Sequence, residues 1–408
     1  MGWIQAICHK EIHGTGAAGN IMLADARGGD FAPWAGQVQL VYLDPPFMTG
    51  EDFSFRMRVG KAGWETGKEV ITQPAYSDRF ESTGEYLALL RDALENAKML
   101  LDESGSLFLH LDSRMSAHAR ILCDEIFGES NFVNEIIWAY QTGGRSMKRF
   151  SRKHDVILFY RKSRRQFFDI TAVPLPRSEN RSNHMRKCVD ENGRSFRTIQ
   201  SGGKTYTYYD DDPVYPGDVW SDVSHLQQKD PQRTGYDTQK PQALLNRIIL
   251  SSTRPGDLVA DLFAGSGTTA LAAAANGRRY LSADLSPQSL SVTRKRLLET
   301  EYTLSAPFHC PNARLEAEFI PGIAYHDIYL SQYIPPQGEI RGLDAIDQWS
   351  VGFYQDGAFY AQASAARRKH TPDLPALLQL PQLRGTPAIL IIDIYGNRSL
   401  WRQKEDEE

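Results

Sequence analysis

The sequence has few cysteines, no long apolar run and little net charge. Its four cysteines, Cys8, Cys123, Cys188 and Cys310, lie far apart and lack the spacing of metal ligands. We therefore expect reduced thiols, no metal site and a cytoplasmic location. No stretch approaches the roughly 18 apolar residues of a membrane span, and residues 1–10 lack the basic and then apolar order of a secretory signal. The sequence thus predicts no association with a membrane.

The charge is distributed unevenly. The net charge of −4 argues by itself against a nucleic-acid partner, but residues 145–187 contain 13 Lys or Arg and three acids. A basic segment inside an acidic chain is typical of a localised phosphate-binding surface. A solvated charged face is the alternative interpretation.

Apolar periodicity predicts alternating strands and helices in a chain of 408 residues, which is long enough for one large α/β domain and a smaller one. The expected strands cover 20–25, 38–44, 106–112, 134–140, 156–160, 258–263 and 280–284. The expected helices cover 85–101, 115–127, 241–253, 268–276 and 286–301, the last with Ser286 as its N-cap. Such alternation favours a parallel sheet that is covered by helices on both faces.

Two regions break this alternation. Residues 165–232 are rich in Pro, Gly, Asn, Arg and Tyr and are too many for a simple loop, so we expect a small irregular domain there. After residue 306 the composition shifts to Pro-containing linkers and short β-like runs at 350–363 and 388–401. These runs predict a C-terminal β-rich unit.

The segment DLFAGSGTT, from Asp261 to Thr269, follows a predicted strand and opens a predicted helix. Its small residues, Ala264 to Gly267, would let a ligand approach the backbone closely, and glycine can take the positive φ of a tight turn. Alone, such a turn could be mere strand–helix punctuation. However, Asp284 ends the next expected strand, where a carboxylate can bind a ribose diol. The turn lacks the third glycine of a dinucleotide fingerprint and the Gly-Lys-Ser/Thr of a P-loop, which argues against phosphate binding.

The tetrapeptide Asp44-Pro45-Pro46-Phe47 closes the apolar run VQLVYL. Two consecutive prolines make a stiff loop with free carbonyl groups. Such a loop can present the Asp44 carboxylate and the Pro45 carbonyl to the two hydrogens of one amino group, which favours a nitrogen lone pair aimed at a methyl sulfonium. Phe47 would stack on a base that has left the duplex. The alternative is a Pro-rich loop with Phe47 packed in the core.

On these two elements the chain resembles the DNA amino-methyltransferases, specifically the β-class permutation, in which the catalytic motif precedes the cofactor motif. The resemblance covers roughly residues 19–297. It includes Thr238-Gln239-Lys240-Pro241, EIIWAYQTGG…KRFSRKHDVILFYRKS over 135–163 and DVWSDV over 218–223. It implies an α/β, Rossmann-like S-adenosylmethionine-dependent methyltransferase sheet with a circularly permuted motif order.

The resemblance also implies a division of the chain. Residues 1–164 would form the catalytic half of the methyltransferase domain, 165–232 the irregular target-recognition region, 233–305 the cofactor-binding half and 306–408 a C-terminal β-rich accessory domain.

Carried over residue by residue, the resemblance implies two sets of site residues. The residues that bind the target base would be Asp44, Pro45, Pro46 and Phe47. Those that bind S-adenosylmethionine would be Asp25 at the adenine, Thr238 and Lys240 at the carboxylate, Asp261, Phe263, Gly265, Ser266 and Gly267 on the methionine side, and Asp284 at the ribose. For Lys240, an ordinary surface lysine is the alternative.

The resemblance implies double-stranded DNA as the substrate and N6 of adenine as the acceptor, because Asp at position 44 resembles the N6-adenine enzymes whereas N4-cytosine members more often have Ser. Phe47 replaces the commoner Tyr, which retains stacking and loses a hydroxyl. The candidates for phosphate contacts are Arg145, Lys148, Arg149, Arg152 and Lys153.

Three alternatives remain open at this point: N4-cytosine methylation, a DNA-binding specificity subunit that has lost catalysis, and an RNA substrate. The intact Asp-Pro-Pro-Phe loop and glycine turn argue against the second, since neither is needed merely to bind DNA. A homodimer and a partner restriction endonuclease are both compatible with the sequence.

Overall fold

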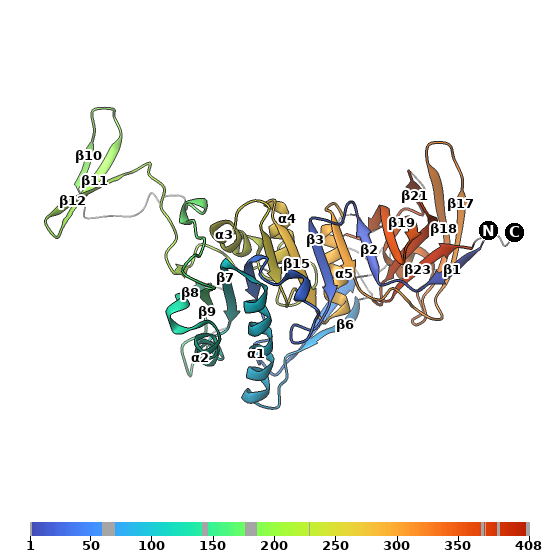
Figure 1. The fold of residues 1–408 in the computed structure, drawn as a ribbon, viewed down its shortest axis with the longest axis horizontal. Coiled ribbons are helices and arrows are strands. Elements are labelled where there is room, and N and C mark those ends of the chain that lie inside the picture. The colour runs from blue at the N-terminus through green and yellow to red at the C-terminus, as the bar shows by residue number, and fades with distance from the viewer. Residues whose placement is uncertain are drawn as a thin grey trace.

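The computed structural model describes residues 2–58, 70–140, 146–175, 186–227, 229–368, 371, 373–381 and 384–404. The molecule is elongated, with a small three-stranded sheet projecting at one end and the C-terminal β-rich region at the other (Figure 1). None of the helices in the described part of the chain is both long and apolar enough to cross a membrane.

A 15-stranded sheet runs through the body. Its central strands, in spatial order, are β16 (Tyr302–Ser305), β3 (Gly19–Leu23), β15 (Arg279–Asp284), β14 (Leu258–Asp261), β4 (Val38–Leu43) and β7 (Leu101–Leu111). Each is parallel to its neighbours in this series. Beyond β7 the sheet continues through β9 (His154–Arg161), β8 (Phe132–Ala139) and β13 (Val219–Trp220), of which β9 is antiparallel to both β7 and β8.

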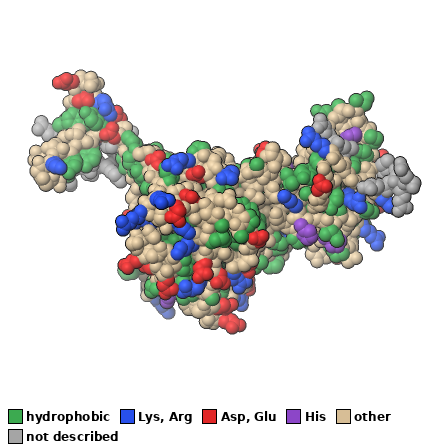
Figure 2. Space-filling model, viewed as in Figure 1, with side chains coloured by type: hydrophobic (Ala, Val, Ile, Leu, Met, Phe, Trp, Pro, Cys, Tyr) green, Lys and Arg blue, Asp and Glu red, His purple; other side chains and the backbone are tan. Residues whose placement is uncertain are grey.

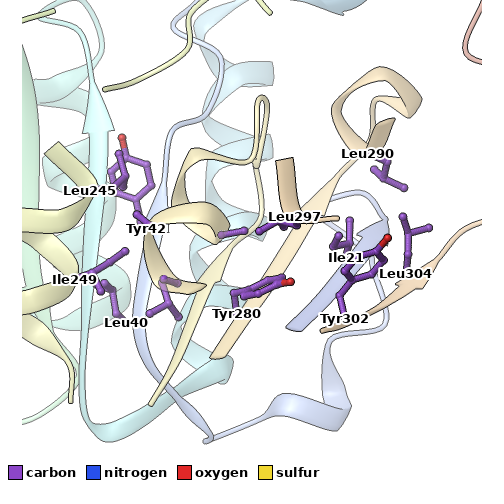
Figure 3. Packing of buried hydrophobic residues seen from close by; sticks show 14 of the residues in the cluster. Ile21, Leu40, Tyr42, Leu245, Ile249, Tyr280, Leu290, Leu297, Tyr302 and Leu304 are labelled. Atoms are coloured by element: carbon purple, nitrogen blue, oxygen red, sulfur yellow. The ribbon is translucent and has the colours of Figure 1, made fainter. Parts of the chain in front are cut away.

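Five α-helices of the described residues cover the two faces of the sheet's central strands. They are α1 (Thr83–Leu100), α2 (Ser116–Phe127), α3 (Gln242–Ser252), α4 (Thr268–Ala275) and α5 (Pro287–Leu297). Leu40 and Tyr42 of β4 belong to the same buried cluster as residues of α3, α4 and α5, whereas Val41 and Leu43 belong to that of α1 and α2. Figure 3 shows part of the first cluster, with Leu245 and Ile249 of α3 beside Leu40 and Tyr42 of β4. Alternate side chains of one strand therefore face two helical layers, as expected for a parallel sheet buried on both faces.

The α/β fold class and the helices expected from apolar periodicity are confirmed, with ends displaced by a few residues. Two details differ from the expectation. β7 begins at Leu101 and runs through Gly105, where a Cβ atom would lie 2.9 Å from the Val38 carbonyl oxygen, so glycine permits a close approach of β4 rather than ending the element. Ser286 is the N-cap residue of α5, but its hydroxyl contacts Gln288 and does not cap a backbone N–H.

The C-terminal region is β-rich, as the sequence predicts. The long sheet is extended by β2 (Lys10–His13), β20 (Ala358–Ala366), β19 (Ile346–Gln355), β22 (Thr386–Asp393), β23 (Arg398–Gln403) and β1 (Trp3–Ala6), in that spatial order. A second sheet consists of β17 (Arg314–Ile320), β18 (His326–Ile334) and β21 (Leu377–Leu380).

The expected division of the chain places β1 and β2 in the catalytic half, residues 1–164, but in the structure they lie next to C-terminal strands. β1 pairs with β23, and β2 lies between β16 and β20, so the first strands join the C-terminal region to the methyltransferase-like sheet. Arg294 of α5 and Glu11 of β2, both fully buried, form an ion pair of 2.7 Å across this junction. Removing one partner of such a buried pair typically costs about 3–5 kcal/mol, because the other charge is left unpaired.

Residues 165–232 are less irregular than expected. They contain an antiparallel three-stranded sheet of β10 (Arg186–Val189), β11 (Ser195–Ser201) and β12 (Lys204–Tyr209), which projects from the body in Figure 1. The sequence also did not predict the antiparallel pair of β5 (Asp52–Arg58) and β6 (Val70–Ser77), which stands between β4 and α1 in the chain. Short 3-10 helices cover Ala32–Trp34, Glu129–Asn131, Ile170–Ala172 and Gly342–Ala345.

Candidate active site

A cavity of about 600 Å³ lies where β4, β14 and β15 end. Its wall includes residues 44–47 after β4, residues 261–266 at the turn after β14, Asp284 at the end of β15, residues 74–78 of the hairpin and residues 236–240 before α3. The carboxyl ends of parallel strands meet at one edge of a sheet, and ligands of open α/β sheets bind there. The structure thus brings the two sequence motifs into one cavity of a size typical of small-ligand sites.

The Asp44 carboxylate divides its two oxygens between different surroundings. Its Oδ2 lies 2.5 Å from the Nζ atom of Lys240, whose side chain is 9% exposed. Its Oδ1 is buried and has no hydrogen-bond partner among the described residues. A buried acceptor without a partner is costly, so an arriving donor would be bound favourably at this oxygen.

The loop after Asp44 is held by a residue that the sequence reasoning missed. Asp78, which is 1% exposed, accepts hydrogen bonds from the backbone N–H groups of Met48 at 2.7 Å and Thr49 at 2.9 Å. It also accepts one from the Thr49 hydroxyl at 2.6 Å. Met48 has a φ of 56°, which is uncommon for a residue other than glycine, and the Asp78 bonds hold this turn in place.

The glycine turn after β14 is held from both ends. The Gly265 N–H donates to Asp284 Oδ2 at 2.7 Å, and the Asp261 carboxylate accepts the Phe263 N–H at 3.0 Å and the Thr269 hydroxyl at 2.6 Å. Gly267 has a φ of 72°, which glycine adopts without the strain that other residues incur. The predicted turn residues therefore lie together at the cavity.

Side chains of α5 support this turn from outside the cavity. A Cβ atom on Gly267 would lie 2.4 Å from the Thr293 hydroxyl oxygen, so the turn packs directly on the helix. Arg296 donates to the Ser266 carbonyl oxygen at 2.8 Å and to the Thr268 hydroxyl at 2.9 Å. Neither Thr293 nor Arg296 was expected from the sequence, since both lie outside the motif.

Burial alters the ionisation of the two acids at this turn. It raises the pKa of Asp261 to about 7, although the hydrogen bonds from Thr269 and Phe263 oppose the shift, and it also raises the pKa of Asp284. Because the pKa of Asp261 is higher in the folded than in the unfolded chain, its stabilising contribution is complete at acid pH, below the usual carboxyl pKa. The contribution is lost as the pH rises through about 7.

An Asp261→Asn variant is therefore expected to lose stability relative to the wild type at pH 5 and to gain it at pH 8. The difference between the two proteins should change by a few kcal/mol, at about 1.4 kcal/mol per pKa unit. Urea unfolding of both proteins at the two pH values measures this. A difference that does not vary with pH would show that Asp261 is ionised throughout.

The remaining predicted cofactor residues, Asp25 and Thr238, also line the cavity. Asp25 lies in the turn after β3 and is paired with Arg27 at 2.6 Å, and this hydrogen-bonded contact lowers the pKa of Asp25. Thr238 has a φ of 62°, and its hydroxyl lies 3.2 Å from that of Tyr76 in the hairpin. Lys240, predicted at the cofactor carboxylate, contacts Asp44.

A buried polar and aromatic cluster lies beside Phe47, and the sequence reasoning missed it. The His110 ring lies 5.9 Å from the Phe47 ring, its Nδ1 lies 2.8 Å from the Tyr42 hydroxyl, and its Nε2 lies 3.1 Å from Asp155. The Tyr140 hydroxyl donates to the other Asp155 oxygen at 3.1 Å. Burial opposes ionisation of Asp155, but the hydrogen bonds from His110 and Tyr140 and the nearby charges lower its pKa overall. The sequence signal that could have indicated this cluster is a histidine within the apolar strand β7 and an aspartate within the apolar strand β9.

The predicted phosphate contacts lie on the loop between β8 and β9. Lys148, Arg149 and Arg152 are exposed there and Lys153 is half-buried, whereas Arg145 lies outside the described residues. The two ends of the loop are adjacent, because the Tyr140 N–H donates to the Lys153 carbonyl oxygen at 2.9 Å. Figure 2 shows Lys and Arg side chains, mixed with acids, at the end of the body from which the small sheet projects.

The chemistry of the cavity fits S-adenosylmethionine. Six aspartates line it, Asp25, Asp44, Asp78, Asp237, Asp261 and Asp284, against the three cations Arg27, Arg79 and Lys240. An acidic cavity favours a ligand that carries a sulfonium and an ammonium, and it disfavours the phosphates of a nucleotide. A Cβ atom on Gly265 would lie 3.4 Å from the Tyr236 ring, so the glycine turn and Tyr236 face each other at the cavity wall.

Comparison with known proteins identifies the family. Residues 38–295 match the family model for DNA methylases of the N6/N4 type. The type II methyltransferase M.EcaI of Enterobacter cloacae is 25% identical over 308 residues, 64% of this chain and 64% of that enzyme, so the match spans slightly less than two thirds of its length. The type II methyltransferase M1.MboII of Moraxella bovis is 29% identical over 259 residues, 62% of this chain and 85% of that one. The DNA adenine methyltransferase YhdJ of Escherichia coli (strain K12) is 25% identical over 265 residues, 64% of this chain and 77% of that one.

Solved structures to which this chain is similar include the M1.HpyAVI–SAM complex, with a TM-score of 0.40 and 17% identity over 68% of this chain and 98% of that one. The cytosine-N4-specific PvuII DNA methyltransferase has a TM-score of 0.44 and 15% identity over 69% of this chain and 86% of that one. Because the family model matches more than half of its length, the chain belongs to the N6/N4 family of S-adenosylmethionine-dependent DNA methyltransferases.

Proposed function

We propose that this chain transfers a methyl group to the N6 amino group of adenine in duplex DNA, after the base has left the helix. The observation that carries the proposal is the Asp44 carboxylate, which lines the same cavity as the glycine turn and has one buried oxygen without a hydrogen-bond partner among the described residues. When bound, S-adenosylmethionine supplies a methyl group on a positively charged sulfur.

The residues of the loop have complementary tasks. Asp44 Oδ1 and the Pro45 carbonyl oxygen accept the two hydrogens of the amino group, which orients the nitrogen lone pair along the direction of attack. Phe47 stacks on the extruded base. Lys240 holds Asp44 through Oδ2, and its ammonium lies 5.0 Å from the centre of the Phe47 ring, so one cation fixes both the carboxylate and the ring.

Apart from Lys240, we assign the cofactor residues the roles that the resemblance implies. Gly265, Ser266 and Gly267 provide the backbone cradle, Asp261 braces it, and Asp284 lies where a ribose would be bound. The two Asp284 oxygens accept the N–H groups of Gly265 and Ser286, which fixes the orientation of the carboxylate before a ligand arrives. Since Lys240 is engaged with Asp44, we assign the cofactor carboxylate to Thr238.

The product distinguishes adenine from cytosine as the target. Asp44 and the E. coli relative named a DNA adenine methyltransferase favour adenine. Genomic DNA from a host without DNA methylases offers every short sequence, so the purified protein can be tested on it with S-adenosylmethionine carrying a deuterated methyl group. We expect labelled N6-methyladenine after digestion to nucleosides and mass analysis. Labelled N4-methylcytosine would overturn the base assignment, and label that appears only in added RNA would overturn the substrate.

The loop cations predict a salt-dependent DNA affinity. Reversing Lys148 and Arg149 to glutamate should weaken DNA binding at least tenfold and reduce the slope of log K against log salt by about two, since each phosphate contact contributes about 0.9. The matched control reverses Arg314 and Lys404, two exposed cations of the C-terminal region. An unchanged slope in the Lys148/Arg149 variant would move the DNA surface elsewhere.

A further inference from the structure

The loop between β8 and β9 exposes two large apolar side chains. Met147 and Phe150 are each 99% exposed, so neither contributes to the core of the free protein. Single apolar residues on a surface are ordinary, but here two stand three positions apart on the same loop. Their exposure is therefore a feature that packing within the chain does not explain.

The same loop is strongly cationic. Residues 146–153 read SMKRFSRK and contain no acid, so Met147 and Phe150 lie among Lys148, Arg149 and Arg152. An apolar partner such as a membrane core or a protein core would have to accept these charges together with the two apolar side chains. A nucleic-acid duplex accepts both, because its phosphates bind the cations and its base stack accepts a flat apolar group.

The foot of the loop lies beside the candidate base site. Lys153 is tied to Tyr140 through the backbone, the Tyr140 hydroxyl donates to Asp155, and Asp155 contacts His110 against the Phe47 ring. Tyr140 also lies 5.4 Å from His225, ring centre to ring centre. A duplex whose target base reaches Phe47 must therefore pass close to this loop.

We infer that Phe150, with Met147 beside it, is the wedge that enters the base stack of duplex DNA at the position the target base leaves. This inference rests on the proposed function, since a wedge is needed only where a base is extruded. Extrusion sacrifices stacking and pairing, and an aromatic side chain in the vacated gap restores part of the stacking. The flanking cations bind the phosphates of the opened step and hold the wedge in register.

The test uses synthetic duplexes of the site mapped by sequencing the methylated genomic DNA. In one duplex the target adenine is paired with thymine, and in a second it lies opposite an abasic site, where extrusion costs less. We expect Phe150→Ala to lose roughly ten- to a hundredfold in kcat/KM on the paired duplex and to regain most of this on the second. Phe150→Trp should retain activity on both. The control is Ile323→Ala, which removes an equally exposed apolar side chain from the C-terminal region.

A second readout is independent of turnover. With 2-aminopurine in place of the target adenine, the wild type should raise the fluorescence on binding and Phe150→Ala should not. Equal losses by Phe150→Ala on both duplexes, or no loss on either, would overturn the wedge while leaving the proposed function intact. A wild-type protein that methylates no genomic DNA, despite binding the cofactor, would overturn the proposed function itself.

Discussion

Replacing Asp44 by alanine is expected to reduce methyl transfer by about a thousandfold or more, because it removes the acceptor that positions the amino nitrogen. Binding of S-adenosylmethionine should remain within a few fold of the wild type, since the glycine turn and Asp284 are untouched. Asp44→Asn keeps one acceptor oxygen, so its rate of methyl transfer should lie between those of the wild type and Asp44→Ala. Single-turnover methylation of genomic DNA and calorimetric cofactor titration measure the two effects.

Stability needs a separate control in this variant. Asp44→Ala leaves Lys240 buried without its partner, which is expected to lower the free energy of unfolding by a few kcal/mol. The double variant Asp44→Ala/Lys240→Met removes both charges and should regain stability without regaining methyl transfer. A stable double variant with wild-type activity would refute the role assigned to Asp44.

A methyl group added to Gly267 is expected to displace the glycine turn of the cofactor site, because it would collide with α5 on the side away from the cavity. Gly267→Ala combines a φ of 72° with a Cβ only 2.4 Å from the Thr293 hydroxyl oxygen, so the turn must shift away from α5. We expect a loss of about 2–4 kcal/mol in stability, from backbone strain and overpacking together, and at least a tenfold weaker cofactor affinity.

Gly277 provides the matched control for this substitution. It has a φ of 71° but nothing within 4 Å of an added Cβ, so Gly277→Ala should cost only the strain of about 1 kcal/mol and leave cofactor affinity unchanged. Thr293→Ala in the Gly267→Ala background removes the nearest two atoms and should restore part of the loss. Equal effects of Gly267→Ala and Gly277→Ala would show that contact with α5 does not matter.

The sequence predicts the parts of the site that are continuous in the chain. Asp44 to Phe47 and Asp261 to Gly267 each stand after a buried strand, and the period of the flanking residues identifies those strands. Because parallel strands end at one edge, the meeting of the two motifs also follows from the order of elements. The sequence alone therefore predicts that the two motifs share one site.

Contacts between segments that are distant in the chain cannot be predicted in this way. Lys240 and Asp44 are 196 positions apart, and only the approach of the segment before α3 to the loop after β4 makes them a pair. Asp78 directly follows a hairpin that local patterns did not predict, since Pro74 stands within its second strand. The union of β1 and β2 with the C-terminal strands likewise depends on pairing across nearly the whole chain.

The measurement that tests the central claim most directly is a crystal structure of the protein with the reaction product S-adenosylhomocysteine. The account predicts the product in the cavity, with its homocysteine part at the Gly265–Gly267 turn, its ribose hydroxyls at Asp284 and its sulfur facing the loop of Asp44 and Pro45. A product bound elsewhere, or one whose sulfur faces away from that loop, would contradict the claim that this cavity brings methyl donor and target base together.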